Sequence, residues 1–135
     1  MKSLILVRHG KAEPRVKSRH DSERRLTAEG RHEVRMVARG LARLTDAAVI
    51  ISSPLVRARQ TADLLAEAFD PPLNVELSED LATMENLPAV VDRLNLRREE
   101  TIILVGHEPG MSELAGFLLA GRVGMRLDFK KAGAC

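Results

Sequence analysis

Two segments, LILVRHG at residues 4–10 and TIILVGHEPG at residues 101–110, each join an apolar run to a histidine beside a glycine. The apolar runs are typical of buried strands, and neither His9 nor His107 lies inside its run as a packed core imidazole would. Each neighbouring glycine allows another group to approach the backbone closely. Ligands bind at the carboxyl ends of the strands in open parallel sheets. Two imidazoles at one such edge, one of them beside Arg8, therefore predict chemistry on an anion.

Strand-like and helix-like patterns alternate along the chain. Apolar runs predict strands over residues 3–7, 49–51, 74–77 and 101–105. Thr27 is the predicted N-cap of a helix over residues 28–44, and Ser53-Pro54 predicts the start of a second helix, with proline at its first position. Two further helices are expected, one from Pro88 and one marked by Met111, Leu114, Ala115 and Leu118 that ends near Gly121. The alternation predicts an α/β fold, a three-layer sandwich with a mostly parallel central sheet flanked by helices.

Length and composition restrict the class of protein. The 135 residues predict one domain, residues 1–135, and the 44% hydrophobic and 30% charged fractions are those of an ordinary globular protein. The formal net charge is only +2, and the chain has three Phe but neither Trp nor Tyr. Both properties argue against a nucleic-acid partner, because no strong positive field and no base-stacking platform is available.

The ends of the chain and its single cysteine bear on location. Cys135 is the only cysteine, so no internal disulfide forms, as expected in a reducing compartment. The first apolar run is too short for a signal sequence and no segment reaches membrane-spanning length, so we expect a cytoplasmic protein without a membrane partner. Residues 127–129 and 133–135 resemble the beginning of a further strand or hairpin, and our hypothesis is that C-terminal strands are missing.

Three groups of residues have the composition of a phosphoryl site. Arg8 offers a fork-shaped donor to a dianion, His9 a nucleophile that is neutral near pH 7, and Gly10 a backbone that phosphoryl oxygens can approach. Arg57 follows Ser53-Pro54 at the start of a helix, which is a natural anion site, whereas Arg59 must point elsewhere. His107 would donate a hydrogen bond to a phosphoryl oxygen. Each group taken alone also fits an interpretation without catalysis: a solvated turn, an exposed helix arginine or a structural histidine.

Together, these motifs resemble those of the histidine phosphatase superfamily, which has the phosphoglycerate mutase-like fold. The resemblance rests on RHG at residues 8–10, SPxxRAxQTA at 53–62 and GHxP at 106–109, and RxLTxxG at 24–30 also matches. The short chain and the segment at 106–110 are most similar to the SixA-type phosphohistidine phosphatases. The resemblance implies that His9 is the transiently phosphorylated nucleophile and that Arg8, Arg57 and His107 surround the phosphoryl oxygens, with Gly10 beside them.

The same resemblance implies catalysis without a metal or other cofactor. Two guanidiniums supply the charge, while the four histidines lack paired metal-ligand spacing and no cysteine cluster exists. Larger members of the superfamily protonate the leaving oxygen with a carboxylic acid. Glu79, Asp80 and Glu85 lie in the matching region as candidates, but no motif selects one of them and each also fits a solvated loop charge. The imidazole of phosphohistidine leaves more readily than an alkoxide, so such a substrate needs this acid less.

Three functions remain open. The first is a phosphatase for a protein that carries phosphohistidine, which a compact domain with an open site favours. The second is a phosphatase for a small phosphomonoester, and the third is a catalytically idle phospho-binding module. The basic loop over residues 11–25, with Lys11, Arg15, Lys17 and Arg19, either flanks the pocket and attracts an acidic partner or is solvated. We prefer the solvated interpretation, also for His20 and Asp21. The oligomeric state does not follow from the sequence.

Overall fold

The computed structural model describes residues 2–121 and 131–134. Its elements are, in chain order, β1 (Ser3–Arg8), a short 3-10 helix η1 (Asp21–Glu23), α1 (Ala28–Leu44), β2 (Val49–Ser52), α2 (Val56–Glu67), β3 (Asn74–Leu77), α3 (Asp80–Thr83), α4 (Leu87–Asn95), β4 (Thr101–Gly106) and α5 (Gly110–Ala120). The four strands form one sheet in the order β1-β4-β2-β3, and every pair among them is parallel. Ala134 adds an isolated antiparallel bridge to Val7.

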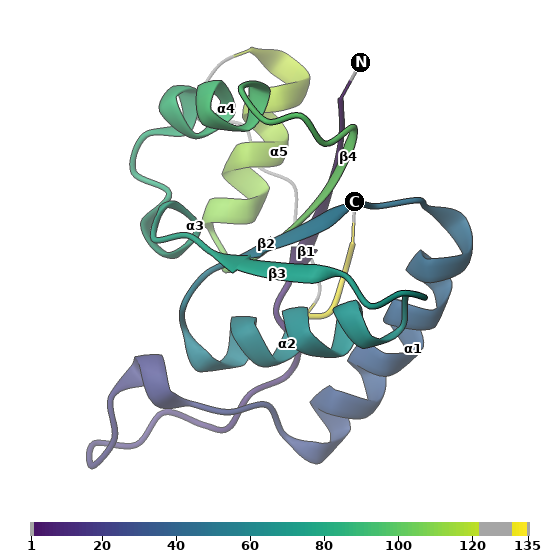
Figure 1. Ribbon diagram of the computed structural model, residues 1–135. Helices are drawn as coiled ribbons and strands as arrows, with labels where there is room; N and C mark the ends of the chain where they lie inside the picture. The colour runs from purple at the N-terminus through teal and green to yellow at the C-terminus, as the bar shows by residue number, and fades with distance from the viewer. Residues whose placement is uncertain (1, 122–130, 135) are drawn as a thin grey trace.

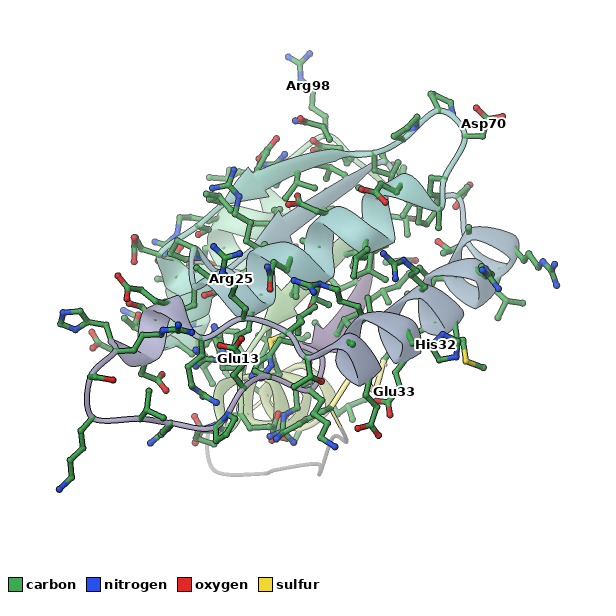
Figure 2. The ribbon with its side chains drawn as sticks, turned by 90° about the horizontal axis from the view of Figure 1, so that it is seen from below. Glu13, Arg25, His32, Glu33, Asp70 and Arg98 are labelled. Carbon is green, nitrogen blue, oxygen red and sulfur yellow. The ribbon has the colours of Figure 1, made fainter. Side chains whose placement is uncertain are left out.

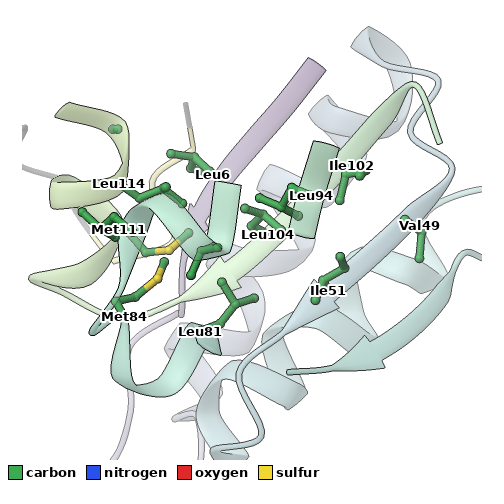
Figure 3. Packing of buried hydrophobic residues seen from close by; sticks show 13 residues of the cluster. Leu6, Val49, Ile51, Leu81, Met84, Leu94, Ile102, Leu104, Met111 and Leu114 are labelled. Atoms are coloured by element: carbon green, nitrogen blue, oxygen red, sulfur yellow. The ribbon is translucent and has the colours of Figure 1, made fainter. Parts of the chain in front are cut away.

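Helices cover both faces of the sheet (Figure 1). Helices α1 and α2 pack on one face, and α3, α4 and α5 gather on the other. The strands supply both cores because successive side chains of a strand point to opposite faces. In β4, Ile102 and Leu104 join the cluster with α3–α5, whereas Ile103 and Val105 join the cluster with α1 and α2. Figure 3 shows the first of these clusters, with Leu81, Met84, Met111 and Leu114 against the strands. The predicted three-layer α/β sandwich is therefore confirmed.

The sheet register brings the predicted site residues to one edge. Arg8 pairs with Gly106, and Ser52 pairs with Val105, so β1, β4 and β2 end side by side. The next residues continue this order: the N–H of His9 donates to the carbonyl of Gly106 at 3.0 Å, and the N–H of Ser53 donates to the carbonyl of Val105 at 3.0 Å. His9, His107 and Ser53 therefore follow three adjacent strands.

Helix α1 begins where its sequence predicts. The side chain of Thr27 accepts a hydrogen bond from the N–H of Gly30 at 3.0 Å, which caps the helix. Gly30 is required there by a close approach of two backbone segments: a Cβ added to it would lie 2.2 Å from the carbonyl oxygen of Lys11. This contact fixes α1 against the segment that follows His9.

One predicted helix start was wrong. Helix α2 begins at Val56 rather than at Pro54, and its N-cap Leu55 makes no side-chain cap bond. The Ser53 hydroxyl instead accepts the N–H of Leu55 at 3.3 Å and reaches toward the site. The four-residue helix α3 was not predicted, and the predicted strand start at 127–129 lies outside the described residues.

Candidate active site

The imidazole of His9 is buried, and its two nitrogens have different partners. Nδ1 lies 2.7 Å from the carbonyl oxygen of Gly10, and because a carbonyl only accepts, Nδ1 carries the hydrogen. Nε2 therefore holds the lone pair, and the Nε–H of Arg57 donates to it at 3.3 Å. The ring is thus oriented by its own loop with its nucleophilic nitrogen toward a guanidinium.

The second imidazole, that of His107, lies directly beside the first. The two ring centroids are 5.1 Å apart and the planes are tilted by 53°. Nε2 of His107 lies 2.7 Å from the hydroxyl oxygen of Ser53, which is fully buried. Nδ1 of His107 is buried and has no hydrogen-bond partner among the described residues. Nε2 of this ring is therefore held by Ser53, directly after β2, whereas no described residue holds Nδ1.

Both imidazoles are neutral at physiological pH. The pKa of His9 is lowered to about 3, chiefly by burial; the positive charges of His107, Arg57 and Arg8 also lower this pKa, whereas the hydrogen bond to Gly10 raises it. Burial, followed by the charge of Arg57, lowers the pKa of His107 to about 4. These two pKa values apply to the site without a bound anion. A dianionic group bound between the rings would raise them and so favour protonation of the imidazoles. The site has a neutral nucleophile in a strongly positive surrounding.

Arg57 is the central cation of the site. It is the second residue of α2, and its side chain is only 6% exposed. Its Nη1 donates to the carbonyl oxygen of Asp21 at 2.8 Å, and its Nη2 lies 3.1 Å from the carboxylate of Asp21. Burial lowers the pKa of Arg57, and the charge of Asp21 opposes that effect. The guanidinium therefore bridges the loop before α1 and the nucleophilic nitrogen of His9.

Arg8 and Gly10 flank His9 in the chain. The charge of Arg8 lowers the pKa of both His9 and His107, so this cation belongs to the same electrostatic group. The N–H of Gly10 does not face the rings: it donates to Oγ1 of Thr61 at 3.0 Å, and Thr61 in turn donates to the carbonyl of Arg57. A Cβ on Gly10 would lie 2.7 Å from Cγ2 of Val34. Gly10 thus allows the nucleophile loop to pack on α1.

The carboxylates proposed as acids lie apart from the imidazoles. Glu79 and Glu85 are exposed, and Asp80 pairs with Arg93 at 2.6 Å. A cavity of ≈ 90 Å³ beside His107 is lined by the carboxyl-bearing residues Glu108 and Glu113 together with Thr83 and Met84. Glu108 is already occupied, since it accepts hydrogen bonds from the N–H and the hydroxyl of Ser112. A larger open groove of ≈ 740 Å³ lies at the opposite end of the sheet, between residues 45–48 and 68–74, away from the imidazoles.

Three cations of the basic loop between β1 and α1 are paired with carboxylates of the loop or of α1. Lys11 pairs with Glu29 at 2.6 Å, Arg19 with Glu13 at 2.7 Å and Arg15 with Asp21 at 3.1 Å. The base of the loop is tied down by the bridge between Ala12 and Leu26. Its cations therefore form less of an attractive surface for an acidic partner than the sequence alone indicates.

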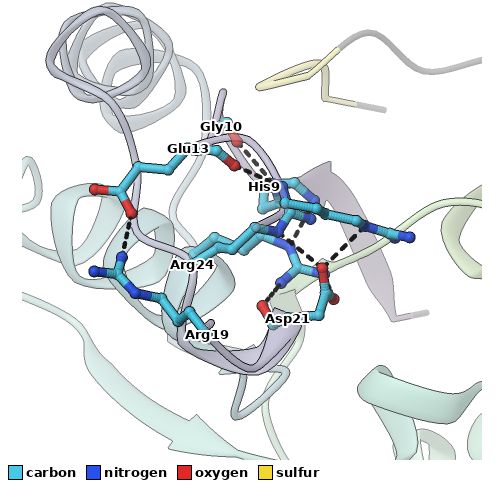
Figure 4. A network of polar contacts seen from close by, with 8 residues as sticks. His9, Gly10, Glu13, Arg19, Asp21 and Arg24 are labelled. Atoms are coloured by element: carbon cyan, nitrogen blue, oxygen red, sulfur yellow. Dashed lines mark hydrogen bonds and ion pairs between the residues drawn. The ribbon is translucent and has the colours of Figure 1, made fainter. Parts of the chain in front are cut away.

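Asp21, Ser53 and Thr61 were not predicted as parts of the site. Asp21 was interpreted as a solvated loop charge; its side chain is 42% exposed, but its carboxylate also pairs with Arg57 and Arg24 (Figure 4). Ser53 and Thr61 carry a signal in retrospect, since both belong to the 53–62 motif and both are fully buried polar residues. Asp21 carries no comparable signal, because the contact depends on how the loop folds over α2.

Two absences hold for residues 2–121 and 131–134. No helix there is long and apolar enough to cross a bilayer. In the same ranges, no group of three or more His, Cys, Asp or Glu side chains is arranged to hold a metal ion. Catalysis without a metal stays a prediction.

The parallel α/β sandwich carries two imidazoles and a buried guanidinium at the carboxyl edge of its sheet. Comparisons with known proteins name the class of protein that this arrangement defines. A sequence profile of the histidine phosphatase superfamily (branch 1) matches residues 4–88. An uncharacterised protein of Picosynechococcus sp. is 36% identical over 134 residues, which cover 96% of this chain and 81% of that protein. The chain belongs to the histidine phosphatase superfamily.

Solved structures share the fold. The protein histidine phosphatase SixA, in complex with tungstate, superimposes with a TM-score of 0.82 at 23% identity, covering 96% of this chain and 83% of that one. A mycobacterial glucosyl-3-phosphoglycerate phosphatase gives 0.76 at 21% identity, covering 99% and 91%. A phosphoserine phosphatase from Entamoeba histolytica gives 0.74 at 18% identity, covering 99% and 89%. The expected likeness to the SixA fold is confirmed, and at these identities it concerns the fold alone.

Proposed function

We propose that the protein is a phosphatase that works through a phosphohistidine intermediate on His9. One observation carries the proposal: Nε2 of His9 accepts the Nε–H of Arg57 at 3.3 Å, and the centroid of the His9 ring lies 5.1 Å from that of the His107 ring, so a lone pair, a guanidinium and a second imidazole meet in one place. A phosphoryl group placed there meets a nucleophile on one side and hydrogen-bond donors around its equatorial oxygens.

The reaction has two steps in this proposal. Nε2 of His9 attacks phosphorus, the bond from phosphorus to the substrate breaks, and the leaving nitrogen or oxygen takes a proton from solvent. Water then attacks the phosphorylated His9, the P–Nε2 bond breaks, and orthophosphate leaves. Arg8, Arg57 and His107 bind the phosphoryl oxygens in both steps, and Gly10 gives the loop its shape. The phosphohistidine intermediate divides one difficult displacement into two easier ones, as in covalent catalysis generally.

The low pKa of His9 supports the role of nucleophile. With a pKa of about 3, the ring is unprotonated at pH 7 and its lone pair is available. The hydrogen bond from Nδ1 to Gly10 predicts that the phosphoryl group is attached to Nε2 and not to Nδ1. His107 gains a proton more easily once the dianion is bound, and then donates to it.

For the substrate we propose phosphohistidine on a protein. Of the three carboxylates considered as acids, two are exposed and Asp80 is paired with Arg93, so a substrate whose leaving group needs little protonation fits best. A group presented on a protein surface requires neither an enclosing pocket nor a dedicated acid.

The test is a side-by-side assay on a phosphohistidine protein and a panel of small phosphomonoesters. We expect a higher kcat/KM for the phosphohistidine protein, and loss of activity in His9→Ala but not in His32→Ala. His32 is the matched control because it is an exposed histidine on α1 (Figure 2). A rapid quench into alkali, in which phosphohistidine is stable, should trap the label of a labelled substrate on Nε2 of His9.

Other outcomes would select other functions. Preference for a small ester would indicate a phosphomonoesterase and overturn the protein substrate. Binding of tungstate without turnover of any substrate would indicate an idle phospho-binding module. Full activity of His9→Ala would overturn the phosphohistidine mechanism.

A further inference from the structure

The guanidinium of Arg57 contacts Asp21 with its terminal nitrogens and His9 with its Nε–H. Its terminal nitrogens are both directed to Asp21, Nη1 to the main-chain carbonyl at 2.8 Å and Nη2 to the carboxylate at 3.1 Å. Its Nε–H is directed to Nε2 of His9 at 3.3 Å. A guanidinium has five N–H groups in one rigid plane, so fixing the terminal nitrogens also fixes the direction of Nε. The N–H groups not directed to Asp21 remain for phosphoryl oxygens in front of His9.

Asp21 is itself held by a second arginine. Nε of Arg24 donates to the other carboxylate oxygen at 2.8 Å, and Nη1 of Arg24 donates to the carbonyl of Glu13 at 2.8 Å. The side chain of Arg24 is only 14% exposed, compared with 78% for Arg15, which also approaches the Asp21 carboxylate. A chain of contacts therefore leads from the base of the loop through Arg24 and through Asp21, whose side chain is 42% exposed, to the buried Arg57 (Figure 4).

The charges agree with this arrangement. Burial raises the pKa of the Asp21 carboxyl, but the hydrogen bond from Arg24 and the charges of Arg57, Arg24 and Arg15 outweigh burial and hold that pKa below its ordinary value. The carboxylate is therefore ionised wherever the enzyme is folded and active, and it gives Arg57 a permanent anionic partner. An arginine that lacks such a partner in a site only 6% exposed has no fixed orientation.

We propose that Asp21 is the positioning residue of the phosphatase reaction: it fixes the guanidinium of Arg57 so that the Nε–H edge faces the phosphoryl group on His9. The inference rests on the proposed function and adds to it a residue outside the superfamily motifs at 8–10, 53–62 and 106–109. Asp21 acts through Arg57 and does not touch the substrate. Its loss should therefore affect kcat/KM only while Arg57 is present.

The experiment is a double-mutant cycle on kcat/KM with Asp21→Ala, Arg57→Ala and the double variant, assayed on phosphohistidine protein. We expect Asp21→Ala to lower kcat/KM by about tenfold or more in the wild-type background, as loss of a charged hydrogen bond does. In the Arg57→Ala background the same substitution should cost less than about twofold. Tungstate affinity, measured by calorimetry, should show the same non-additivity. Asp21→Asn keeps an acceptor at this position and should recover part of the loss.

Two controls make the result specific. Glu23→Gln removes an exposed carboxylate from the same 3-10 helix and should leave kcat/KM unchanged. The free energy of unfolding, measured in urea, separates a local effect from loss of the fold. Equal losses in both backgrounds, or full activity of Asp21→Ala, would overturn the inference. If the wild-type chain shows no turnover at all, the proposed function fails instead, and tungstate binding alone then decides whether Asp21 positions Arg57.

Discussion

The hydroxyl of Ser53 joins the end of β2 to the ring of His107. Its oxygen lies 2.7 Å from Nε2 of His107 and accepts the N–H of Leu55 at 3.3 Å. Because Ser53 is fully buried, water does not replace this contact. The hydroxyl therefore sets the plane of the second imidazole at 53° to the first.

Ser53→Ala should lower kcat by about tenfold, which corresponds to one lost hydrogen bond of about 1.4 kcal/mol in the transition state. The ring of His107 would lose the partner that orients it, while Arg8 and Arg57 would still bind the phosphoryl group, so KM should change less. Steady-state kinetics measure both. Ser18→Ala, in the exposed part of the loop, is the control. A kcat within twofold of the wild type would show that Ser53 does not orient His107.

Thr61→Val should lower the free energy of unfolding by about 1–3 kcal/mol. Valine keeps the shape of the side chain but leaves the buried N–H of Gly10 without the oxygen that now accepts it at 3.0 Å. Thr45→Val is a matched comparison, since Oγ1 of Thr45 is buried and makes no hydrogen bond within the described ranges. That variant should be neutral or stabilising. Urea titrations of both proteins check the prediction, and equal destabilisation by the two changes would contradict it.

The two depressed histidine pKa values predict a loss of stability in acid. The pKa of His9 is about 3 and that of His107 about 4 in the folded protein, against an ordinary 6.5 when unfolded. The unfolded state therefore binds more protons below pH 6.5, and the stabilisation that is complete above this pH is lost as the pH falls toward 4. Each histidine contributes a slope of at most about 1.4 kcal/mol per pH unit.

Variants isolate this effect from the titration of carboxylates. Urea unfolding between pH 7.5 and 5 should show a weaker pH dependence for His9→Asn than for the wild type. His32→Asn, which removes an exposed histidine, should leave the dependence unchanged. An identical pH dependence in His9→Asn and the wild type would mean that the His9 pKa is not depressed.

Two glycines of α1 should respond oppositely to alanine. Gly30→Ala places a Cβ 2.2 Å from the carbonyl oxygen of Lys11, so either α1 or the segment after His9 must move, and both stability and activity should fall. Gly40 has nothing within 4 Å of the corresponding position, and alanine there should stabilise the helix by about 0.5–1 kcal/mol. Thermal unfolding compares the two, and a stabilising Gly30→Ala would refute the backbone contact.

Local patterns predicted most of the framework. The bounds of α1 follow from the Thr27 cap and the apolar spacing, and β3 follows from its short apolar run between breakers. The start of α2 was wrong because the Ser53 hydroxyl bonds the neighbouring Leu55 N–H and His107 rather than a helix N–H.

Within the site, only the residues that belong to a sequence motif could be predicted. The sequence predicts that His9 and His107 share an edge because parallel strands end together, and their rings lie 5.1 Å apart. The partner of Arg57 could not be predicted, since Asp21 reaches it from a loop without periodicity. Contacts of this kind depend on the course of the loop, which neither propensity nor spacing encodes.

The position of β4 between β1 and β2 has a consequence for biosynthesis. During translation, the segments that carry His9 and Arg57 leave the ribosome long before β4. That strand lies between β1 and β2 in the sheet and pairs Thr101 with Ser3 of β1. Until that strand emerges, β1 has no partner in the sheet and His9 no second ring beside it. A nascent chain therefore brings the rings of His9 and His107 together only after β4 has been inserted between β1 and β2.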